Sequence, residues 1–270
     1  SGGASAITPN PMQEEALQAI QDVRDSGHKR AGVISATGTG KTILSALDVK
    51  AFGPRRFLFL VHREQIIDRA MDEYKRVLGG VESDYGKVVG AVRQFDAKYV
   101  FSTIQSFSRA DVLAQVEPGT FDYVLIDEVH RAGAGTYQRV LGHLRPEFLL
   151  GTTATPERSD GFNIFELFDY NVAYEIRLHD ALEEDMLVPF HYYGVSDVTL
   201  TDGSTITVDS DVHTLVSQPR VEHIVSALDS YSQQGVKTRG LIFCTRLNEA
   251  QRLSEELNQH SLGARLLRTK

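Results

Sequence analysis

The sequence predicts an α/β fold, a doubly wound parallel β-sheet with helices on both faces. From residue 12 to about residue 168, unbroken apolar runs alternate with helical patterns. Such runs are typical of parallel strands that are buried on both faces. In addition, the polar segments that could carry chemistry follow the predicted strands, at the edge where open α/β sheets bind ligands.

The predicted elements alternate in a regular order along this region. Strands are expected near residues 32–36, 57–61, 98–102, 122–126 and 147–152, with a weaker one at 87–92. Helices are expected near residues 12–25, 41–51, 63–78, 136–144 and 161–167.

The last third of the chain has a different character. Residues 191–212 are rich in β-forming residues around Asp202-Gly203, which suggests a hairpin or an extended connector. A helix is expected from Arg220 to about Gln233, followed by a strand at 239–245 and a helix at 248–257. These last two elements form one strand–helix unit.

The composition is ordinary for a globular protein, with 270 residues of which 41% are hydrophobic and 24% charged. The net charge of −8 argues against a protein that coats nucleic acid by bulk charge, but a local groove can still bind phosphates. A single cysteine, Cys244, excludes a disulfide scaffold and a Cys/His metal site. No run approaches the roughly 18 apolar residues of a membrane span, and the first residues lack the features of a signal peptide. A cytoplasmic setting without a membrane partner is therefore expected.

The segment Ser35-Ala-Thr-Gly-Thr-Gly-Lys-Thr42 lies between a predicted strand and a predicted helix and has the pattern of a phosphate-binding loop. Glycines let backbone N–H groups close on phosphate oxygens, and the helix N-terminus adds partial positive charge. The strict pattern begins with Gly where this chain has Ser35, and an ordinary glycine-rich turn is the alternative. The residues predicted to bind nucleotide here are Thr37, Gly38, Thr39, Gly40, Lys41 and Thr42.

A second half-site follows the apolar run Phe121-Asp-Tyr-Val-Leu-Ile126, which leads directly into Asp127-Glu128. Two carboxylates at a strand end beside a phosphate loop are typical of an NTPase site. Asp127 and Thr42 are predicted to hold Mg²⁺, and Glu128 to polarise the attacking water. The alternative is a pair of solvated acids, which the preceding phosphate loop disfavours.

With both half-sites, the chain resembles the superfamily 2 helicases and translocases over nearly its whole length. Phosphate-loop kinases and GTPases lack the Asp-Glu-x-His and Thr-Ala-Thr-Pro segments found here. The resemblance implies RecA-like domains that use ATP and Mg²⁺, with Lys41, Asp127 and Glu128 as catalytic residues. It also implies that Gln13 reads the adenine. The residues that it implies for coupling hydrolysis to domain movement are His130, Thr153 and Thr155.

Three further segments resemble family motifs that contact a nucleic-acid backbone. They are Leu58–Glu64, Ser102–Ser106 and Phe243–Arg246. The residues that the resemblance assigns to nucleic acid are Arg63, Thr103, Gln105 and Thr245. For the first two segments the alternative is an ordinary helix N-cap.

A narrower resemblance covers Pro156–Gly161, Tyr174–Leu182 and Leu187–Phe190. These segments are similar to a bacterial branch of DEAD/DEAH-box proteins that is related to the motor subunits of restriction systems and often carries nuclease-like domains. The alternative for part of this stretch is a packing helix with one apolar face. That face would consist of Leu178, Leu182, Met186 and Leu187.

The expected organisation is a RecA-like ATP-binding domain at 1–178, a connector at 179–216 and the start of a second RecA-like domain at 217–270. A full second domain needs on the order of 130 residues, so this one is expected to be partial and to lack its later motifs. The expected function is an ATP-dependent helicase or translocase that acts on nucleic acid, DNA more than RNA. A non-motor nucleotide switch that gates an appended or separate nuclease is the main alternative, and a small-molecule kinase is disfavoured by Thr153-Ala-Thr155.

Overall fold

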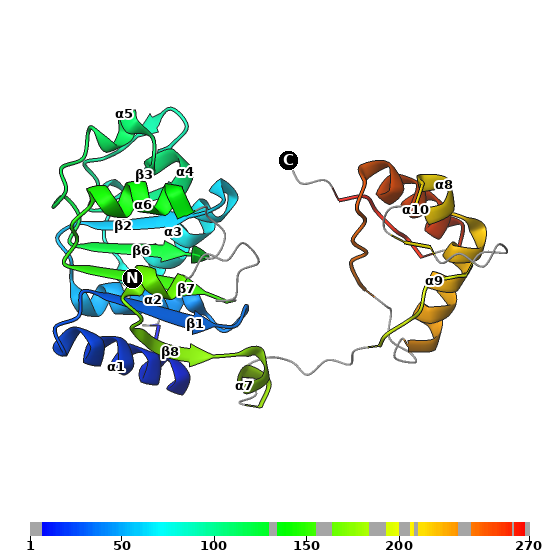
Figure 1. Ribbon diagram of the computed structural model, residues 1–270, viewed down its shortest axis with the longest axis horizontal. Helices are drawn as coiled ribbons and strands as arrows, with labels where there is room; N and C mark the ends of the chain where they lie inside the picture. Colours follow the sequence, from blue (N-terminus) through cyan, green and yellow to red (C-terminus); the bar gives the residue numbers. More distant parts are fainter. Residues whose placement is uncertain are drawn as a thin grey trace, which may run out of the picture. The chain divides into compact units, whose positions relative to one another are not determined.

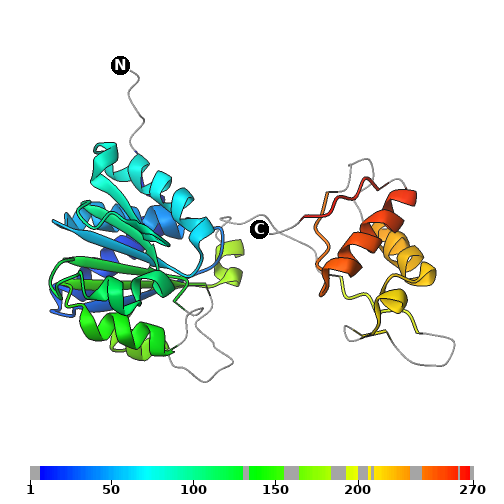
Figure 2. The ribbon, with the colours of Figure 1, turned by 90° about the horizontal axis from the view of Figure 1, so that it is seen from above.

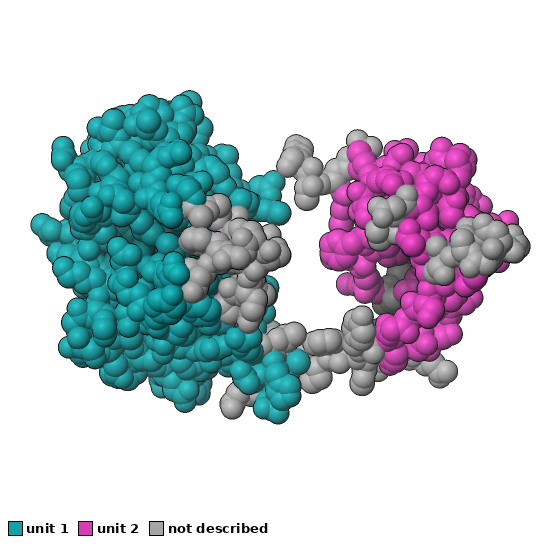
Figure 3. Space-filling model, viewed as in Figure 1, with its two compact units in different colours: residues 1–189 teal, residues 190–270 magenta. Residues whose placement is uncertain are grey.

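The computed structural model describes residues 7–129, 134–154, 164–183, 193–199, 206–207, 210–231, 239–260 and 262–267. The chain divides into two compact units, residues 1–189 and 190–270, which Figure 3 colours separately. The residues predicted as a separate connector, 179–216, are thus shared between the two units. The predicted domain bounds, 1–178, 179–216 and 217–270, remain predictions.

The first unit is built on one eight-stranded sheet with the order β4-β3-β5-β2-β6-β7-β1-β8. All neighbouring strands run parallel except β3 and β4, which are antiparallel. The strands are β1 (Arg30–Ser35), β2 (Phe57–Val61), β3 (Tyr85–Val89), β4 (Val92–Arg93), β5 (Tyr99–Thr103), β6 (Tyr123–Asp127), β7 (Phe148–Thr153) and β8 (Val172–Ile176).

Helices cover both faces of this sheet, as Figure 1 and Figure 2 show. The helices of this unit are α1 (Pro11–Asp25), α2 (Lys41–Phe52), α3 (Glu64–Leu78), α4 (Ile104–Phe107), α5 (Ala110–Leu113), α6 (Ala134–His143) and α7 (Leu178–Glu183), with 3₁₀ turns at Glu82–Asp84 and Ile164–Phe168.

The unbroken apolar strands are explained by two cores, one on each face. In β2, Phe57 and Phe59 pack into the core under α1, α2 and α3, whereas Leu58 and Leu60 pack into the core under α4 and α6. Successive side chains of a strand point to opposite faces, so a strand between two helix layers must be apolar throughout. The predicted doubly wound parallel sheet is confirmed.

Two strand predictions need correction. The weak strand at 87–92 is the end of β3, a turn at Gly90 with φ 56°, and the start of β4. Strand β8 has no counterpart among the predicted strands, because it pairs only with β1 at the sheet edge and of its residues only Ile176 is buried. An edge strand of this kind lacks the continuous apolar run that marks the central strands.

The 3₁₀ turn at 164–168 replaces part of the helix predicted at 161–167, whose first three residues lie outside the described part of the chain. Phe168 from this turn lies against β7 and β1. A Cβ built on Gly151 would lie 2.0 Å from Phe168 Cζ, and one on Gly32 would lie 3.1 Å from Phe168 Cδ2. These two glycines therefore admit the aromatic ring directly onto the sheet.

The described part of the second unit contains three helices, one bridge residue at Thr199 and segments without regular structure. Its helices are α8 (Val212–Leu215), α9 (Gln218–Tyr231) and α10 (Leu247–Gln259), and its small core contains Val221, Leu253 and Leu257. The strand predicted at 239–245 is not formed. A strand needs a hydrogen-bonding neighbour, and the described residues of this unit offer none. The proposed hairpin turn at Asp202-Gly203 lies outside the described residues.

None of the described helices combines the length and the apolar character of a membrane span.

Candidate nucleotide and nucleic-acid site

The predicted phosphate loop joins the carboxyl end of β1 to the first turn of α2. Gly38 and Gly40 have φ of 93° and 83°, values in the left-handed region that favours glycine, and Gly40 is the N-cap of α2. A Cβ at Gly40 would also lie 2.9 Å from Gln13 Nε2. Thr37, Gly38 and Gly40 are exposed, so the loop is open to solvent at the N-terminus of a helix.

Ser35 and Thr39 close the base of the loop with buried hydroxyl groups. Thr39 Oγ1 donates to Ala36 O at 2.7 Å, so the 2.5 Å contact between Ser35 Oγ and Thr39 Oγ1 is donated by Ser35. This contact gives a reason for Ser35 where the strict pattern has Gly. The Thr39 hydroxyl thus supports the loop from inside, and the predicted contact of Thr39 with a nucleotide stays a prediction.

Lys41 connects the two predicted half-sites. Its Nζ donates to Ser35 O at 3.1 Å and lies 3.7 Å from Glu128 Oε1. The side chain is only 11% exposed, so this charge is held close to the loop. The structure therefore brings together the cation of the phosphate loop and the carboxylate that is predicted to act on water.

Asp127 is the last residue of β6, and its Oδ1 accepts two hydrogen bonds. The Thr152 hydroxyl donates at 2.5 Å and the Glu128 N–H donates at 3.0 Å. Glu128 has φ 55°, which is unusual for a residue with a side chain. Burial raises the pKa of Asp127, the hydrogen bond from Thr152 opposes that rise, the charge of Glu128 adds to it and that of Lys41 opposes it.

This donor set fits a magnesium ion. Mg²⁺ prefers oxygen ligands and keeps several waters, which suits a carboxylate at a strand end and a hydroxyl at a helix N-terminus. Asp127 and Thr42 offer those two oxygens from β6 and α2. A phosphate bound beside Lys41 would supply the remaining oxygens.

Gln13 is placed beside the loop but is already engaged. Its Oε1 accepts from Asn10 N at 3.1 Å in a capping box, and its Nε2 donates to Gly40 O at 3.4 Å. The residue is buried. Pairing with an adenine edge would require these bonds to exchange, so its predicted role stays a prediction.

The predicted nucleic-acid residues of the first unit lie on neighbouring strand ends. Gln105 Nε2 and His62 Nδ1 are 2.8 Å apart, which joins the ends of β5 and β2, and Arg63 is exposed at the N-cap of α3. Thr103 differs from the prediction. It is the N-cap of α4, where its Oγ1 accepts from Ser106 N at 3.1 Å, so the N-cap alternative holds for this residue.

Of the remaining predicted residues, Thr153 lies at the same sheet edge, where it pairs in register with Ile34 of β1. Thr153 ends β7 and is buried, whereas His130 and Thr155 lie outside the described residues. Thr245 belongs to the second unit, where its Oγ1 donates to Glu249 Oε2 at 3.1 Å.

Thr152 is the contact that sequence reasoning missed. It lies within the coupling segment Gly151–Pro156, of which only Thr153 and Thr155 have a predicted role. The parallel register pairs Asp127 with Thr152, and only knowledge of the neighbouring strand could reveal that pairing.

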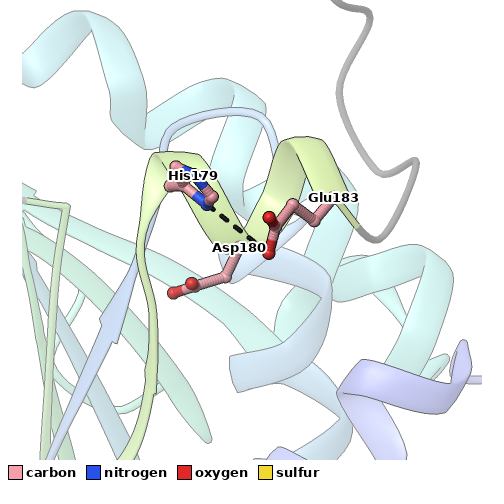
Figure 4. Close-up of side chains that lie close together, drawn as sticks. All are labelled: His179, Asp180 and Glu183. Carbon is pink, nitrogen blue, oxygen red and sulfur yellow. Dashed lines mark ion pairs between the residues drawn. The ribbon is translucent and has the colours of Figure 1, made fainter.

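A separate group of ligand-type side chains lies on α7, shown in Figure 4. His179, Asp180 and Glu183 are all exposed, and their ligand atoms lie within 4.8 Å of one another. Asp180 accepts from Arg177 N at 2.9 Å as a helix cap, and His179 Nδ1 lies 3.5 Å from Glu183 Oε2. These local contacts account for the cluster.

The second unit holds a cavity of about 420 Å³ beside α9. Its walls include Tyr193 and Tyr231, whose rings stack at 4.3 Å between centroids, and the ion pair of Arg220 with Asp197. None of the predicted site residues lines it.

Comparison with known proteins finds similarity to restriction enzymes and helicases. A family model described as type III restriction enzyme, res subunit, matches residues 6–158. The putative mitochondrial ATP-dependent helicase irc3 of Schizosaccharomyces pombe is 25% identical over 97% of this chain and 45% of its own length. A subunit of the type I restriction enzyme EcoAI endonuclease from Escherichia coli is 24% identical over 94% of this chain and 34% of its own length.

Solved structures show the fold. The type ISP restriction-modification enzyme LlaBIII bound to DNA aligns with a TM-score of 0.60 at 15% identity, covering 96% of this chain and 22% of that one. The Hef helicase domain of Pyrococcus furiosus aligns with a TM-score of 0.52 at 12% identity, covering 92% of this chain and 54% of that one. The α/β sheet is thus RecA-like, and the chain spans less than half the length of each of these two curated relatives.

Proposed function

Because the chain belongs to the family described as type III restriction enzyme, res subunit, we propose that it is the nucleotide-binding part of an ATP-dependent nucleic-acid helicase or translocase. One observation carries the proposal. Lys41 of the phosphate loop lies 3.7 Å from Glu128 at the end of β6, next to a carboxylate suited to Mg²⁺. The phosphate loop and the acidic strand end therefore form one site and not two isolated patterns.

The geometry supports a division of roles. Lys41 would exchange its contact with Glu128 for the β- and γ-phosphates, and Glu128 would polarise the attacking water. Backbone N–H groups of the loop and the N-terminus of α2 would hold phosphate oxygens. Mg²⁺, when bound by Asp127 and Thr42, would neutralise phosphate charge.

DNA is the nucleic acid that we propose, with Arg63 and Gln105 as backbone contacts. The support is the similarity to restriction enzymes, one of which is bound to DNA in its structure. A nuclease, appended or separate, is part of the same proposal. We place such a motor in the cytoplasm, where ATP is available.

Isothermal titration of the chain with ADP and Mg²⁺ tests the proposal. The chain should bind ADP, and Lys41→Ala should bind at least about tenfold more weakly, because a buried charge-assisted contact is lost. Lys50→Ala is the matched control, since Lys50 is an exposed lysine in the last turn of the same helix. Equal binding by Lys41→Ala and Lys50→Ala, or no binding by the folded chain, would refute the assignment.

Nucleotide binding without hydrolysis would favour the alternative function, a non-motor nucleotide switch. If ADP and ATP bind but DNA never stimulates phosphate release in any longer form of the protein, the site acts as a nucleotide switch. The two readings are thus separated by a steady-state phosphate-release assay with and without DNA.

A further inference from the structure

The contact between Thr152 and Asp127 joins two neighbouring parallel strands at their carboxyl ends. The two residues are paired in the register of β6 and β7. Thr152 is 2% exposed, and its Oγ1 donates to Asp127 Oδ1 at 2.5 Å. A hydroxyl that donates to an ionised carboxylate makes one of the stronger kinds of protein hydrogen bond.

This hydrogen bond does not act alone on the carboxylate. The Glu128 N–H donates to the same Oδ1 at 3.0 Å, from a residue whose φ is 55°. Among the described residues, both hydrogen bonds to the Asp127 side chain therefore go to one oxygen. Two donors on Oδ1 restrict the rotation of the carboxyl group, and no hydrogen bond from the described residues occupies Oδ2.

We propose that Thr152 is a positioning residue for Asp127, holding Oδ1 so that Oδ2 is presented to a magnesium ion. This inference rests on the proposed function, since it assumes that Asp127 binds the metal of a bound nucleotide. Thr152 also connects the carboxylate to β7, the strand that leads into Thr153.

Packing alone does not explain a threonine at this position. Valine has nearly the same shape as threonine and also favours strands. A buried strand position that needs no hydrogen bond would therefore tolerate valine. The hydroxyl is satisfied by Asp127, and removing it leaves the carboxylate with one hydrogen bond fewer. We therefore expect removal of the Thr152 hydroxyl to weaken Mg²⁺ binding more than it lowers the stability of the fold.

The experiment measures ADP affinity by isothermal titration across a series of Mg²⁺ concentrations. ADP affinity should rise with Mg²⁺ concentration and reach half of this rise at a midpoint concentration. Thr152→Val should increase that midpoint about tenfold, the scale of one hydrogen bond to a charged group. Thr152→Ser should restore it nearly to the original value. ADP affinity without Mg²⁺ should be the same in all variants.

Tyr123→Phe is the matched control. Tyr123 begins β6 and its hydroxyl donates to Asp48 Oδ2 at 2.5 Å, so this variant deletes the same kind of buried bond at the opposite end of the same strand. It should lower the thermal midpoint and leave the Mg²⁺ dependence unchanged. Thr152→Ala serves as a second hydroxyl-free variant if the valine variant does not fold.

The outcomes distinguish the positioning role of Thr152 from the proposed nucleotide-binding function. If the original chain gains affinity with Mg²⁺ and Thr152→Val gains it at the same Mg²⁺ concentration, the positioning role is wrong while the nucleotide site stands. Equal losses with and without Mg²⁺ would make Thr152 a structural residue and also overturn the inference. If the original chain binds no ADP, the proposed function itself fails, and the inference with it.

Discussion

At the scale of single residues, Lys41 already holds partners that a phosphate would replace. Its Nζ contacts Ser35 O at 3.1 Å and Glu128 Oε1 at 3.7 Å. These contacts keep the ammonium group in place without a ligand and shield a carboxylate that would otherwise repel an anion. Nucleotide binding is therefore an exchange of partners at Lys41.

Glu128→Gln should not weaken ADP binding, because the side chain is assigned to water and not to the metal and its negative charge competes with phosphate for Lys41. In a longer, hydrolysing form of the protein, the same substitution should abolish most turnover. Asp127→Ala should instead weaken the Mg²⁺-dependent part of binding. Titration with ADP and a phosphate-release assay check both, and the reverse pattern would mean that the two roles have been exchanged.

Arg63→Ala should weaken binding to single- and double-stranded DNA by the same factor for unrelated sequences, since backbone contacts carry no base information. The log–log dependence of affinity on salt should become shallower by about 0.7–0.9. Arg76→Ala removes an exposed arginine from the other end of α3 and is the control. Fluorescence anisotropy at several salt concentrations gives the slopes, and equal effects of the two variants would exclude a specific role for Arg63.

At the scale of secondary structure, two glycines let the 3₁₀ turn at 164–168 close against the sheet. Gly151→Ala should destabilise the first unit by about 3 kcal/mol, because the new Cβ would meet the Phe168 ring at 2.0 Å. Gly142→Ala is the control in α6, where nothing lies within 4 Å, and should stabilise by up to about 1 kcal/mol. Urea unfolding of both variants tests this, and a neutral Gly151→Ala would show that the ring can move aside.

An ion pair between the buried Asp122 and the exposed side chain of Arg55 joins the residues that precede β2 and β6. Asp122 is 2.7 Å from Arg55 Nη2 and also accepts from the Arg55 and Arg56 N–H groups. Burial raises the pKa of Asp122, but the hydrogen bonds from the Arg55 side chain and from both N–H groups outweigh it, so the pKa lies below its usual 3.8. A lowered pKa stabilises the fold at higher pH, and this stabilisation is lost as pH falls through the folded-state pKa.

Asp122→Asn should therefore lower the free energy of unfolding at pH 7 by about 1 kcal/mol, mainly because the buried carboxylate loses charge-assisted hydrogen bonds from two backbone N–H groups, whereas the exposed Arg55 side chain contributes little. The difference between the two proteins should shrink as pH falls below about 4, because the original side chain then becomes protonated. Unfolding free energies measured from pH 7 to pH 3 would show the convergence. A difference that stays constant with pH would assign the cost to packing.

The sequence predicted an element correctly where a local residue pattern alone determines its structure. Buried on both faces, β2 and β6 show as unbroken apolar runs, and Gly38 and Gly40 mark the loop between β1 and α2. The edge strand β8 carries no such run, and the run at 241–243 forms no strand because pairing depends on a neighbour. Thr152 and the capping role of Thr103 likewise depend on which atoms are adjacent in space, which residue spacing along the chain does not give.

At the scale of the whole molecule, the residues of the proposed nucleotide site all come from the first unit. Lys41, Asp127, Glu128 and Thr152 all lie within residues 1–189. A chain that ends after Pro189 should therefore bind ADP and Mg²⁺ with unchanged affinity. Titration of both forms tests this, with Lys41→Ala in the shorter form as the control for specific binding, and a weaker shorter form would mean that the second unit contributes to the site.

The apolar run of the second unit has a practical consequence for the chain in solution. Leu241, Ile242 and Phe243 are 67%, 50% and 90% exposed, and no described residue pairs with their backbone in a sheet. A short apolar segment with open backbone groups is a template for pairing between molecules. Self-association through this run would grow with protein concentration, and apparent affinities would then depend on how dilute the sample is.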